Sequence, residues 1–255
     1  MPIRECNDAE VLNLKGLHLF HTNVSNCSTR VRLLLEEKGL SWTSHHLNLV
    51  KRENLTESYF RIHPNGLVPA LVDDGVPVTD SIDILYYLEE KYPQPAFLPQ
   101  DSNSREEIRR WIDLAGEIHV KGVKTFVYGK AGLVTKDRSE MDRYEKLAPG
   151  RELVEFHWKS IEGFPAEDIE AAVAILQDSF ERVEAQLEGR TYLVGDSYSL
   201  ADITWVVQYV LLTGKGYDFT PYPNIRRWVA HLEERRAFNR AVTDWLPGGG
   251  RAPTP

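Results

Sequence analysis

The sequence has few cysteines, no long apolar run and no excess of basic charge. Its 255 residues include two cysteines, Cys6 and Cys27, which argues against a disulfide-rich secreted fold and against a structural zinc site. No segment approaches the ~20 consecutive apolar residues of a membrane helix, and the opening residues MPIRECNDAE lack the apolar core of a secretory signal. With 30 basic and 38 acidic side chains the net charge is -8, which disfavours nucleic-acid binding. We expect a cytoplasmic protein with no membrane or nucleic-acid partner.

The composition is that of an ordinary globular protein. Hydrophobic residues make up 42% of the chain and charged residues 27%. A chain of this length forms one large domain or two small ones.

The first part of the chain alternates between strand and helix patterns. After a polar leader that we expect to be loose, a strand–helix–strand order predicts a parallel pair, because such a connection crosses over the sheet. The turn Asp73-Asp74-Gly75 then predicts an antiparallel hairpin. On the first helix, Glu36, Glu37 and Lys38 are expected to face water. The expected strands cover 17–20, 42–49, 70–72 and 77–79, and the expected helices cover 27–38, 55–62 and a segment starting at Ser81.

The second part of the chain contains only helix patterns. It follows the linker PQPAFLPQDSNS, which is rich in helix-breaking residues. Ser104 with Glu107 and Ser199 with Asp202 have the spacing of capping boxes. The charged segment 135–152 is expected to be a surface excursion, and the tail GGGRAPTP to be disordered. We predict an α+β protein with a mixed four-stranded sheet domain at 14–93 and an all-helical domain at 104–246.

Four segments carry a resemblance to a known family. They are SNCSTRVRLLLEEKGL, PNGLVPALVDDG, VTDSIDILYYLEEKYP and YLVGDSYSLADI. In this order they resemble the cytosolic glutathione transferase superfamily, over residues 17–245. The resemblance implies a thioredoxin-like domain before the helical domain, glutathione as cosubstrate and a homodimer. Serine-type members are the most similar: zeta-class isomerases, the tetrachlorohydroquinone dehalogenase and bacterial β-aryl etherases.

Two residues near the first helix are the catalytic candidates. Transfer of glutathione requires its thiolate, and Ser25 would donate a hydrogen bond to the sulfur near a helix N-terminus, whose dipole favours negative charge. Ser25 as a plain N-cap is the structural alternative, although Ser28 is the residue we expect to cap the helix. Cys27 would form a mixed disulfide with glutathione, as in the dehalogenase; its structural alternative is a small buried packing residue.

The remaining glutathione contacts follow from the resemblance. Val68-Pro69 would be a cis peptide that exposes the Val68 backbone to pair with glutathione. Asp80 and Ser81 would bind the γ-glutamyl end, or Ser81 would simply cap a helix.

The glycyl carboxylate of glutathione requires a cation from the loop after the second strand. Lys51 is the first choice, with Arg52 and His46 as alternatives. A solvated surface charge is the structural alternative for each.

The electrophile is expected to bind between the domains. Trp111 and His119 are the candidate contacts, with Phe126, Tyr128, Trp205 and Tyr209 nearby, although aromatic residues at helical spacing usually form core. The predicted function is transfer of glutathione to a small apolar, aromatic electrophile, with ether cleavage or dehalogenation. The alternatives are a zeta-like cis–trans isomerase and a non-catalytic binding module.

Overall fold

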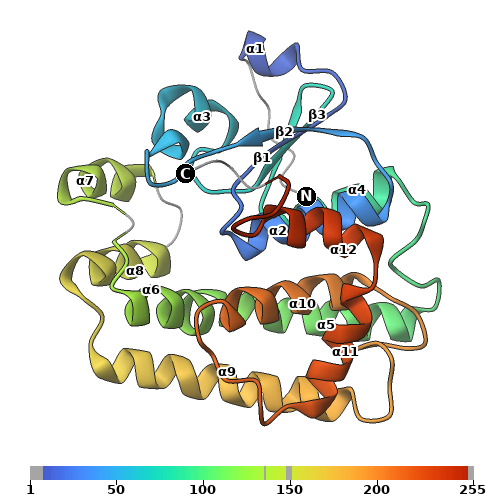
Figure 1. Cartoon of the computed structure of the whole chain (residues 1–255). Helices are drawn as coiled ribbons and strands as arrows, with labels where there is room; N and C mark the ends of the chain where they lie inside the picture. The colour runs from blue at the N-terminus through green and yellow to red at the C-terminus, as the bar shows by residue number, and fades with distance from the viewer. Residues whose placement is uncertain (1–7, 135, 148–150, 252–255) are drawn as a thin grey trace.

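The computed structural model describes residues 8–134, 136–147 and 151–251. A four-stranded sheet forms the N-terminal part of the fold, with strand order β2-β1-β3-β4. β1 pairs in parallel with β2 and antiparallel with β3, and β3 pairs antiparallel with β4. The mixed sheet predicted from the sequence is therefore confirmed (Figure 1). The strands are β1 (Leu17–His21), β2 (Trp42–His46), β3 (Ala70–Asp73) and β4 (Val76–Thr79).

Helices cover both faces of this sheet. In β1 the side chains alternate between buried and half-buried, as expected for a strand with two unlike faces. One face packs on α2 (Asn26–Glu37) and α4 (Ser81–Lys91), and the other on α3 (Glu57–Ile62) and the short α1 (Ala9–Leu12). A single-turn helix, η1 (Glu53–Leu55), precedes α3.

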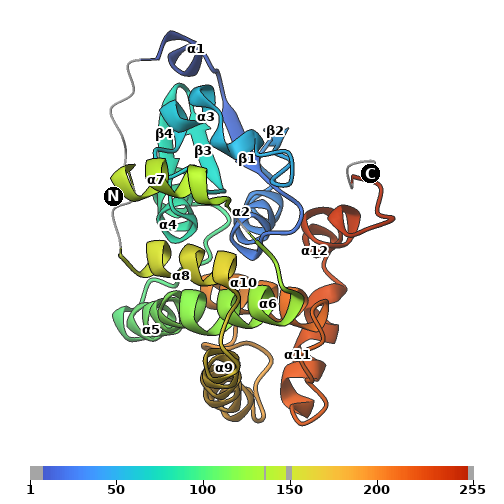
Figure 2. The same cartoon turned by 90° about the vertical axis from the view of Figure 1, so that its left-hand side faces the viewer.

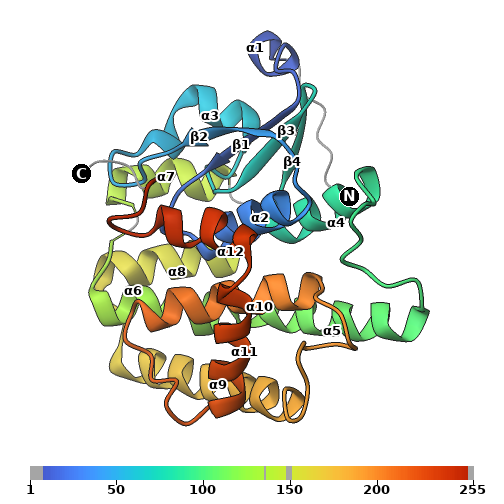
Figure 3. The same cartoon turned by 45° about the vertical axis from the view of Figure 1, so that its right-hand side comes forward.

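The rest of the described chain is helical, as predicted. α5 (Ser102–Ile118) continues through a π-helical segment, η2 (His119–Lys124), into α6 (Thr125–Ala131). α10 (Leu200–Thr213) is buried along most of its length and packs against both α2 and α5, so it joins the two parts (Figure 3). The other elements are α7 (Arg138–Leu147), α8 (Arg151–Glu162), α9 (Ala166–Gln186), α11 (Pro223–Glu233), α12 (Arg236–Ala241) and η3 (Thr243–Trp245).

The predicted capping box that heads α10 is present. The Asp202 carboxylate accepts hydrogen bonds from the backbone and hydroxyl of Ser199, from Leu193 N and from Trp228 Nε1. The box at Ser104 is wrong: Asp101 caps α5 and accepts from Ser104 N at 2.8 Å.

Three other local expectations are corrected. The leader contains α1, which Asp8 caps. The charged segment contributes α7 and the start of α8, while Thr135 and residues 148–150 lie outside the described residues. The tail is placed as far as Arg251, whose Nη1 lies 3.1 Å from Glu36 Oε1; residues 252–255 lie outside the description. The domain limits 14–93 and 104–246 stay a prediction.

No helix in the described ranges is both long and apolar enough to cross a membrane.

Candidate active site

The N-terminal end of α2 brings the two catalytic candidates close together. Ser25 is the N-cap, and its Oγ accepts a hydrogen bond from Ser28 N at 3.2 Å. Ser28 is therefore not the cap; it is buried, and its Oγ accepts from Thr22 N at 3.3 Å. The capping bond uses the Ser25 oxygen as acceptor, so the hydroxyl proton remains available for a ligand.

Cys27 is the second residue of α2 and lies opposite the helical domain. Its half-buried Sγ is 3.6 Å from Nε2 of His119, the residue that begins the π-helical segment. Single π-turns inside α-helices are frequent at functional sites. The structure thus brings together a thiol and an imidazole that are 92 positions apart in the chain.

The surroundings of Cys27 favour its thiolate. Burial alone would raise the pKa of the Cys27 thiol, but His119, the Arg30 guanidinium and the Ser81 hydroxyl together lower it to about 6. A thiol with this pKa is mostly ionised at neutral pH. A nucleophilic sulfur is therefore present at the domain junction.

Arg30 is a site residue that the sequence analysis missed. Only 2% of it is exposed, and its Nη1 donates to Ser81 Oγ at 3.0 Å. The charges of Cys27 and Asp80 both act on it. Its signal in the sequence was an arginine on the apolar helix RVRLLL, since arginine is almost never fully buried without a partner.

Asp80 and Ser81 stand at the start of α4. Asp80 is the N-cap: its Oδ1 accepts from Ile82 N at 3.0 Å, so capping by Ser81 is wrong. Asp80 is exposed and has φ of 72°, a conformation that costs a non-glycine residue free energy and is common at binding sites. Ser81 is buried, and its hydroxyl faces Arg30.

The Val68-Pro69 peptide bond is cis, as the resemblance implied. Val68 is half-buried, and within the described chain neither its N–H nor its C=O forms a hydrogen bond. A donor and an acceptor on one extended residue match the backbone of a peptide ligand.

The three candidates for the glycyl carboxylate are His46 at the end of β2 and Lys51 and Arg52 in the loop after it, and they are in different situations. Arg52 Nε lies 3.3 Å from the Glu140 carboxylate of α7, and His46 Nε2 accepts from Asn23 N at 3.3 Å. Lys51 is exposed, and its ammonium makes no ion pair within the residues described. Lys51 remains the candidate for the glycyl carboxylate.

The predicted electrophile contacts lie on one continuous helix, α5–η2–α6. Trp111 is half-buried, and its ring meets the edge of Trp205, whose Nε1 donates to Trp111 O at 2.9 Å. Trp205 and Phe126 are buried core residues. Tyr128 is half-buried, and its pKa is raised by burial and by the nearby Cys27.

Comparison with known proteins identifies the family of this fold. Residues 19–96 match the family model for the glutathione S-transferase N-terminal domain, and residues 150–236 match that for its C-terminal domain. Over 217 residues the chain is 31% identical to a probable maleylacetoacetate isomerase 1 of Drosophila melanogaster, covering 84% of this chain and 76% of that one. The chain belongs to the glutathione S-transferase family.

Two further relatives match over most of their length. The glutathione S-transferase TCHQD of Arabidopsis thaliana is 28% identical over 249 residues, which is 91% of each chain. The β-etherase LigF of Sphingobium sp. strain SYK-6 superposes with a TM-score of 0.76 at 27% identity, covering 88% of this chain and 98% of that one. This glutathione transferase is therefore an enzyme that uses glutathione as cosubstrate, and its serine-type resemblance is confirmed.

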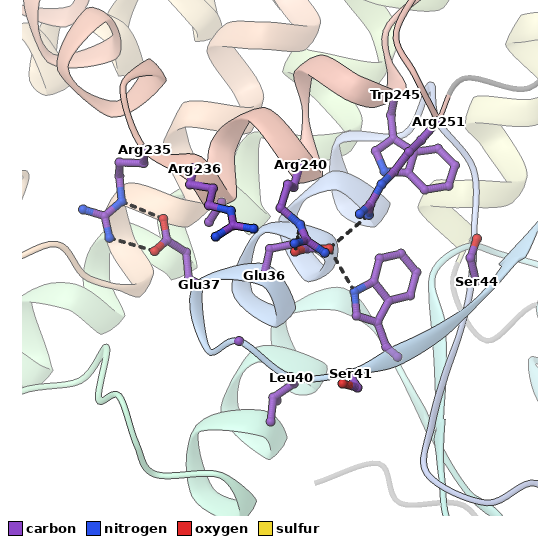
Figure 4. A pocket seen from close by; sticks show the side chains of 13 residues that line it. Glu36, Glu37, Leu40, Ser41, Ser44, Arg235, Arg236, Arg240, Trp245 and Arg251 are labelled. Atoms are coloured by element: carbon purple, nitrogen blue, oxygen red, sulfur yellow. Dashed lines mark hydrogen bonds and ion pairs between the residues drawn. The ribbon is translucent and has the colours of Figure 1, made fainter.

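A groove of about 1000 Å³ also occurs in this glutathione transferase, but at the opposite end of α2. Its lining includes Glu36, Trp42, Arg235 and Arg240 (Figure 4). About six residues of helix, roughly 9 Å, separate Arg30 from Glu36. None of the predicted glutathione-binding residues is among those that line this groove.

Proposed function

We propose that this glutathione transferase attacks a small aromatic electrophile and displaces a phenolate or a halide. The observation that carries the proposal is the Cys27–His119 contact of 3.6 Å beside the N-cap Ser25. This contact supports the proposal because it joins the start of α2 to the helix α5–η2–α6, which also carries the half-buried Trp111. The similarity to a β-etherase and to TCHQD supports this choice of reaction.

We assign the thiol activation to Ser25. Its hydroxyl donates to the glutathione sulfur, and the N-terminus of α2 favours the resulting negative charge. The thiolate then attacks the carbon that carries the leaving group. The C–S bond forms, the C–O or C–halogen bond breaks, and the leaving group departs with the electron pair. Val68, Pro69, Asp80, Ser81 and Lys51 would hold glutathione in the orientation described above.

Cys27 serves a second step when the product is reduced rather than conjugated. Its thiolate attacks the sulfur of the aryl–glutathione conjugate, forming a Cys27–glutathione disulfide and releasing the aryl group as a carbanion that takes a proton. A second glutathione thiolate cleaves that disulfide and leaves as oxidised glutathione. The ionised state of Cys27 supports this step.

An isomerase is the second candidate, supported by the 31% identity to a probable maleylacetoacetate isomerase. In that reaction glutathione adds to a double bond and leaves again, so no glutathione is consumed. Against zeta specificity, Asn26 replaces the second serine of the zeta motif, and its Nδ2 donates instead to Gln208 Oε1 at 2.6 Å.

The proposal is tested by glutathione titration calorimetry followed by turnover of an aryl ether and a halogenated hydroquinone. Activity lost in Ser25→Ala and kept in Cys27→Ser supports direct displacement. Activity lost in Cys27→Ser, together with a Cys27–glutathione disulfide trapped in the unmodified enzyme, supports reduction. Glutathione binding with no turnover of either substrate would overturn the proposed reaction.

We also propose a homodimer located in the cytoplasm, on the family resemblance. Light scattering would give about twice the 29.2 kDa chain mass for the dimer, and a value near the chain mass would overturn it.

A further inference from the structure

Two lysines and a histidine form a cluster beside the electrophile side of the site. Lys124 ends the π-helical segment, Lys136 precedes α7, and His157 lies on α8. Lys136 Nζ is 3.3 Å from His157 Nε2 and 4.3 Å from the ring centre of Tyr144. Lys124 Nζ is 4.4 Å from the ring centre of Phe156. Figure 2 shows α6 and α8 side by side with α7 above them.

The two lysines of the cluster have no matching carboxylate among the residues that the structure describes. Lys136 is 4% exposed and His157 2%, and Lys124 is half-buried. In the part of the chain described, neither lysine forms a salt bridge. Of the carboxylates whose charges act on them, Glu140 is bound to Arg52 and Glu152 is exposed. Lysine is almost never fully buried unless it is paired, yet among the described residues the two lysines have no carboxylate bound to them.

The pKa values of the two lysines and of His157 are all lowered, as expected where no carboxylate is bound to the lysines. Burial lowers the pKa of Lys136 to about 7 and that of Lys124 to about 8. Burial and the two lysine charges lower the pKa of His157 to about 2, so its imidazole is neutral and accepts from Lys136. An anion bound here would favour the charged form of both lysines.

The cluster is connected to the reacting sulfur through His119, whose Nε2 lies 3.6 Å from Cys27 Sγ. Lys124 is five residues after His119, on the same continuous helix. The charge of Cys27 acts on Lys124 and on Tyr128. Lys124 is the half-buried member, and its charge acts on the buried Lys136 and His157.

We propose that the electrophile carries a carboxylate and that Lys124, supported by Lys136 and His157, binds this group. The proposal rests on the glutathione transfer proposed above and refines it, because an apolar electrophile was expected from the sequence. Lys124 contacts the substrate, whereas Lys136 and His157 are positioning residues.

The test compares an acid with its neutral ester. The substrates are 4-chloro-3-nitrobenzoate and its methyl ester. In both, the glutathione thiolate forms a C–S bond at the ring carbon that carries chlorine, and chloride leaves with the electron pair of the broken bond. Each enzymatic rate is divided by the uncatalysed rate with glutathione, since the two rings differ in intrinsic reactivity. The variants are Lys124→Met and Lys136→Met, with Lys121→Met as the control, because Lys121 is exposed on the same π-helical segment.

We expect Lys124→Met to lower kcat/KM for the acid about tenfold, because one charge-assisted contact is lost. The change should appear mainly in KM. The ester should change less than about twofold, and Lys121→Met should leave both unchanged. Lys136→Met should lower the preference for the acid over the ester by a smaller factor than Lys124→Met does. Equal losses for acid and ester, or no loss for the acid, would overturn the carboxylate assignment.

A second readout separates this inference from the transfer reaction. Calorimetry measures the affinity of the glutathione conjugate of the acid and of its ester, with no turnover needed. If the unmodified enzyme prefers the acid conjugate and Lys124→Met loses this preference, the carboxylate site is supported. This holds even if neither substrate reacts, and then only the proposed reaction fails. Equal affinities in the unmodified enzyme would overturn the site while leaving the reaction intact.

Discussion

The two ends of α2 differ in how their charges are matched. At the C-terminal end, Glu37 receives two hydrogen bonds from Arg235 at 2.6 and 2.7 Å, and Glu36 is bound by Arg240, Arg251 and Trp42 (Figure 4). At the N-terminal end, Arg30 is buried and forms no salt bridge within the described chain, and the Cys27 Sγ lies 3.6 Å from His119 Nε2.

The difference separates structural charges from functional ones. Buried groups that already have partners hold elements together, here α12 and the C-terminal residues against α2. Groups that are held close to one another with charge still unmatched are candidates for binding and chemistry. On this criterion the N-terminal end of α2 is the reactive end, and the groove of Figure 4 is a structural junction.

Removing the Ser25 hydroxyl should have the largest effect. We expect Ser25→Ala to lower kcat/KM with glutathione about 100-fold, because a donor aimed at developing negative charge contributes on that scale. Steady-state kinetics at saturating electrophile measure the loss. Ser41→Ala is the matched control, since Ser41 is exposed beside the other end of α2. Equal activity of the Ser25→Ala and Ser41→Ala proteins would contradict the claim that the N-terminal end of α2 is the reactive end.

The acidity of Cys27 provides the second test. In a Cys6→Ser background, alkylation of Cys27 by iodoacetamide should rise with pH and reach half its maximum at about pH 6. His119→Ala should move this midpoint up toward the ordinary thiol value of about 8.5, because the lowering by His119 is lost. His231→Ala, on the distant α11, should not move it. A midpoint near 8.5 in the unmodified protein would contradict the assignment of a thiolate.

Breaking the Glu37–Arg235 pair should affect stability and not catalysis. The Glu37 side chain is 6% exposed and that of Arg235 31%. For this partly exposed two-bond pair we expect Glu37→Gln to reduce the free energy of unfolding by about 1–2 kcal/mol. Denaturant titration measures the loss, with kcat/KM unchanged at a temperature where both proteins are folded. A large loss of activity with unchanged stability would place function at this end of α2.

Arg240→Ala should have the smallest effect. Its side chain is 41% exposed, and Glu36 keeps Trp42 and Arg251 as partners. The free energy of unfolding should change by less than about 0.5 kcal/mol, measured by the same titration. A change as large as that of Glu37→Gln would show that this surface pair is more strongly coupled than its exposure indicates.

Features determined by neighbouring residues could be predicted from the sequence. The strand–helix–strand order and the Asp73-Asp74-Gly75 turn gave the sheet topology, and the Ser199–Asp202 spacing gave the cap of α10. The box at Ser104 failed because Asp101, three residues earlier, caps the helix and accepts from Ser104 N, the group that Glu107 would have bound in the predicted box.

Features that depend on tertiary packing could not be predicted. Glu36, Glu37 and Lys38 were expected to face water, but α12 and the C-terminal residues cover the two glutamates, and Lys38 is buried with its Nζ 2.7 Å from Glu89. The contact of Cys27 with His119 likewise joins two domains. Helical periodicity identifies the apolar face of a helix. It does not show which residues of a second domain will pack against the polar face.

The ionisation of bound glutathione tests the central claim most directly. The ultraviolet difference spectrum of the bound thiolate, followed against pH in Cys27→Ser protein, isolates the glutathione sulfur from the protein thiol at the site. We predict a bound thiolate at neutral pH that is lost when Ser25→Ala is added. Glutathione that binds with an ordinary thiol pKa, or a thiolate that survives Ser25→Ala, would contradict the assignment of thiol activation to the N-terminal end of α2.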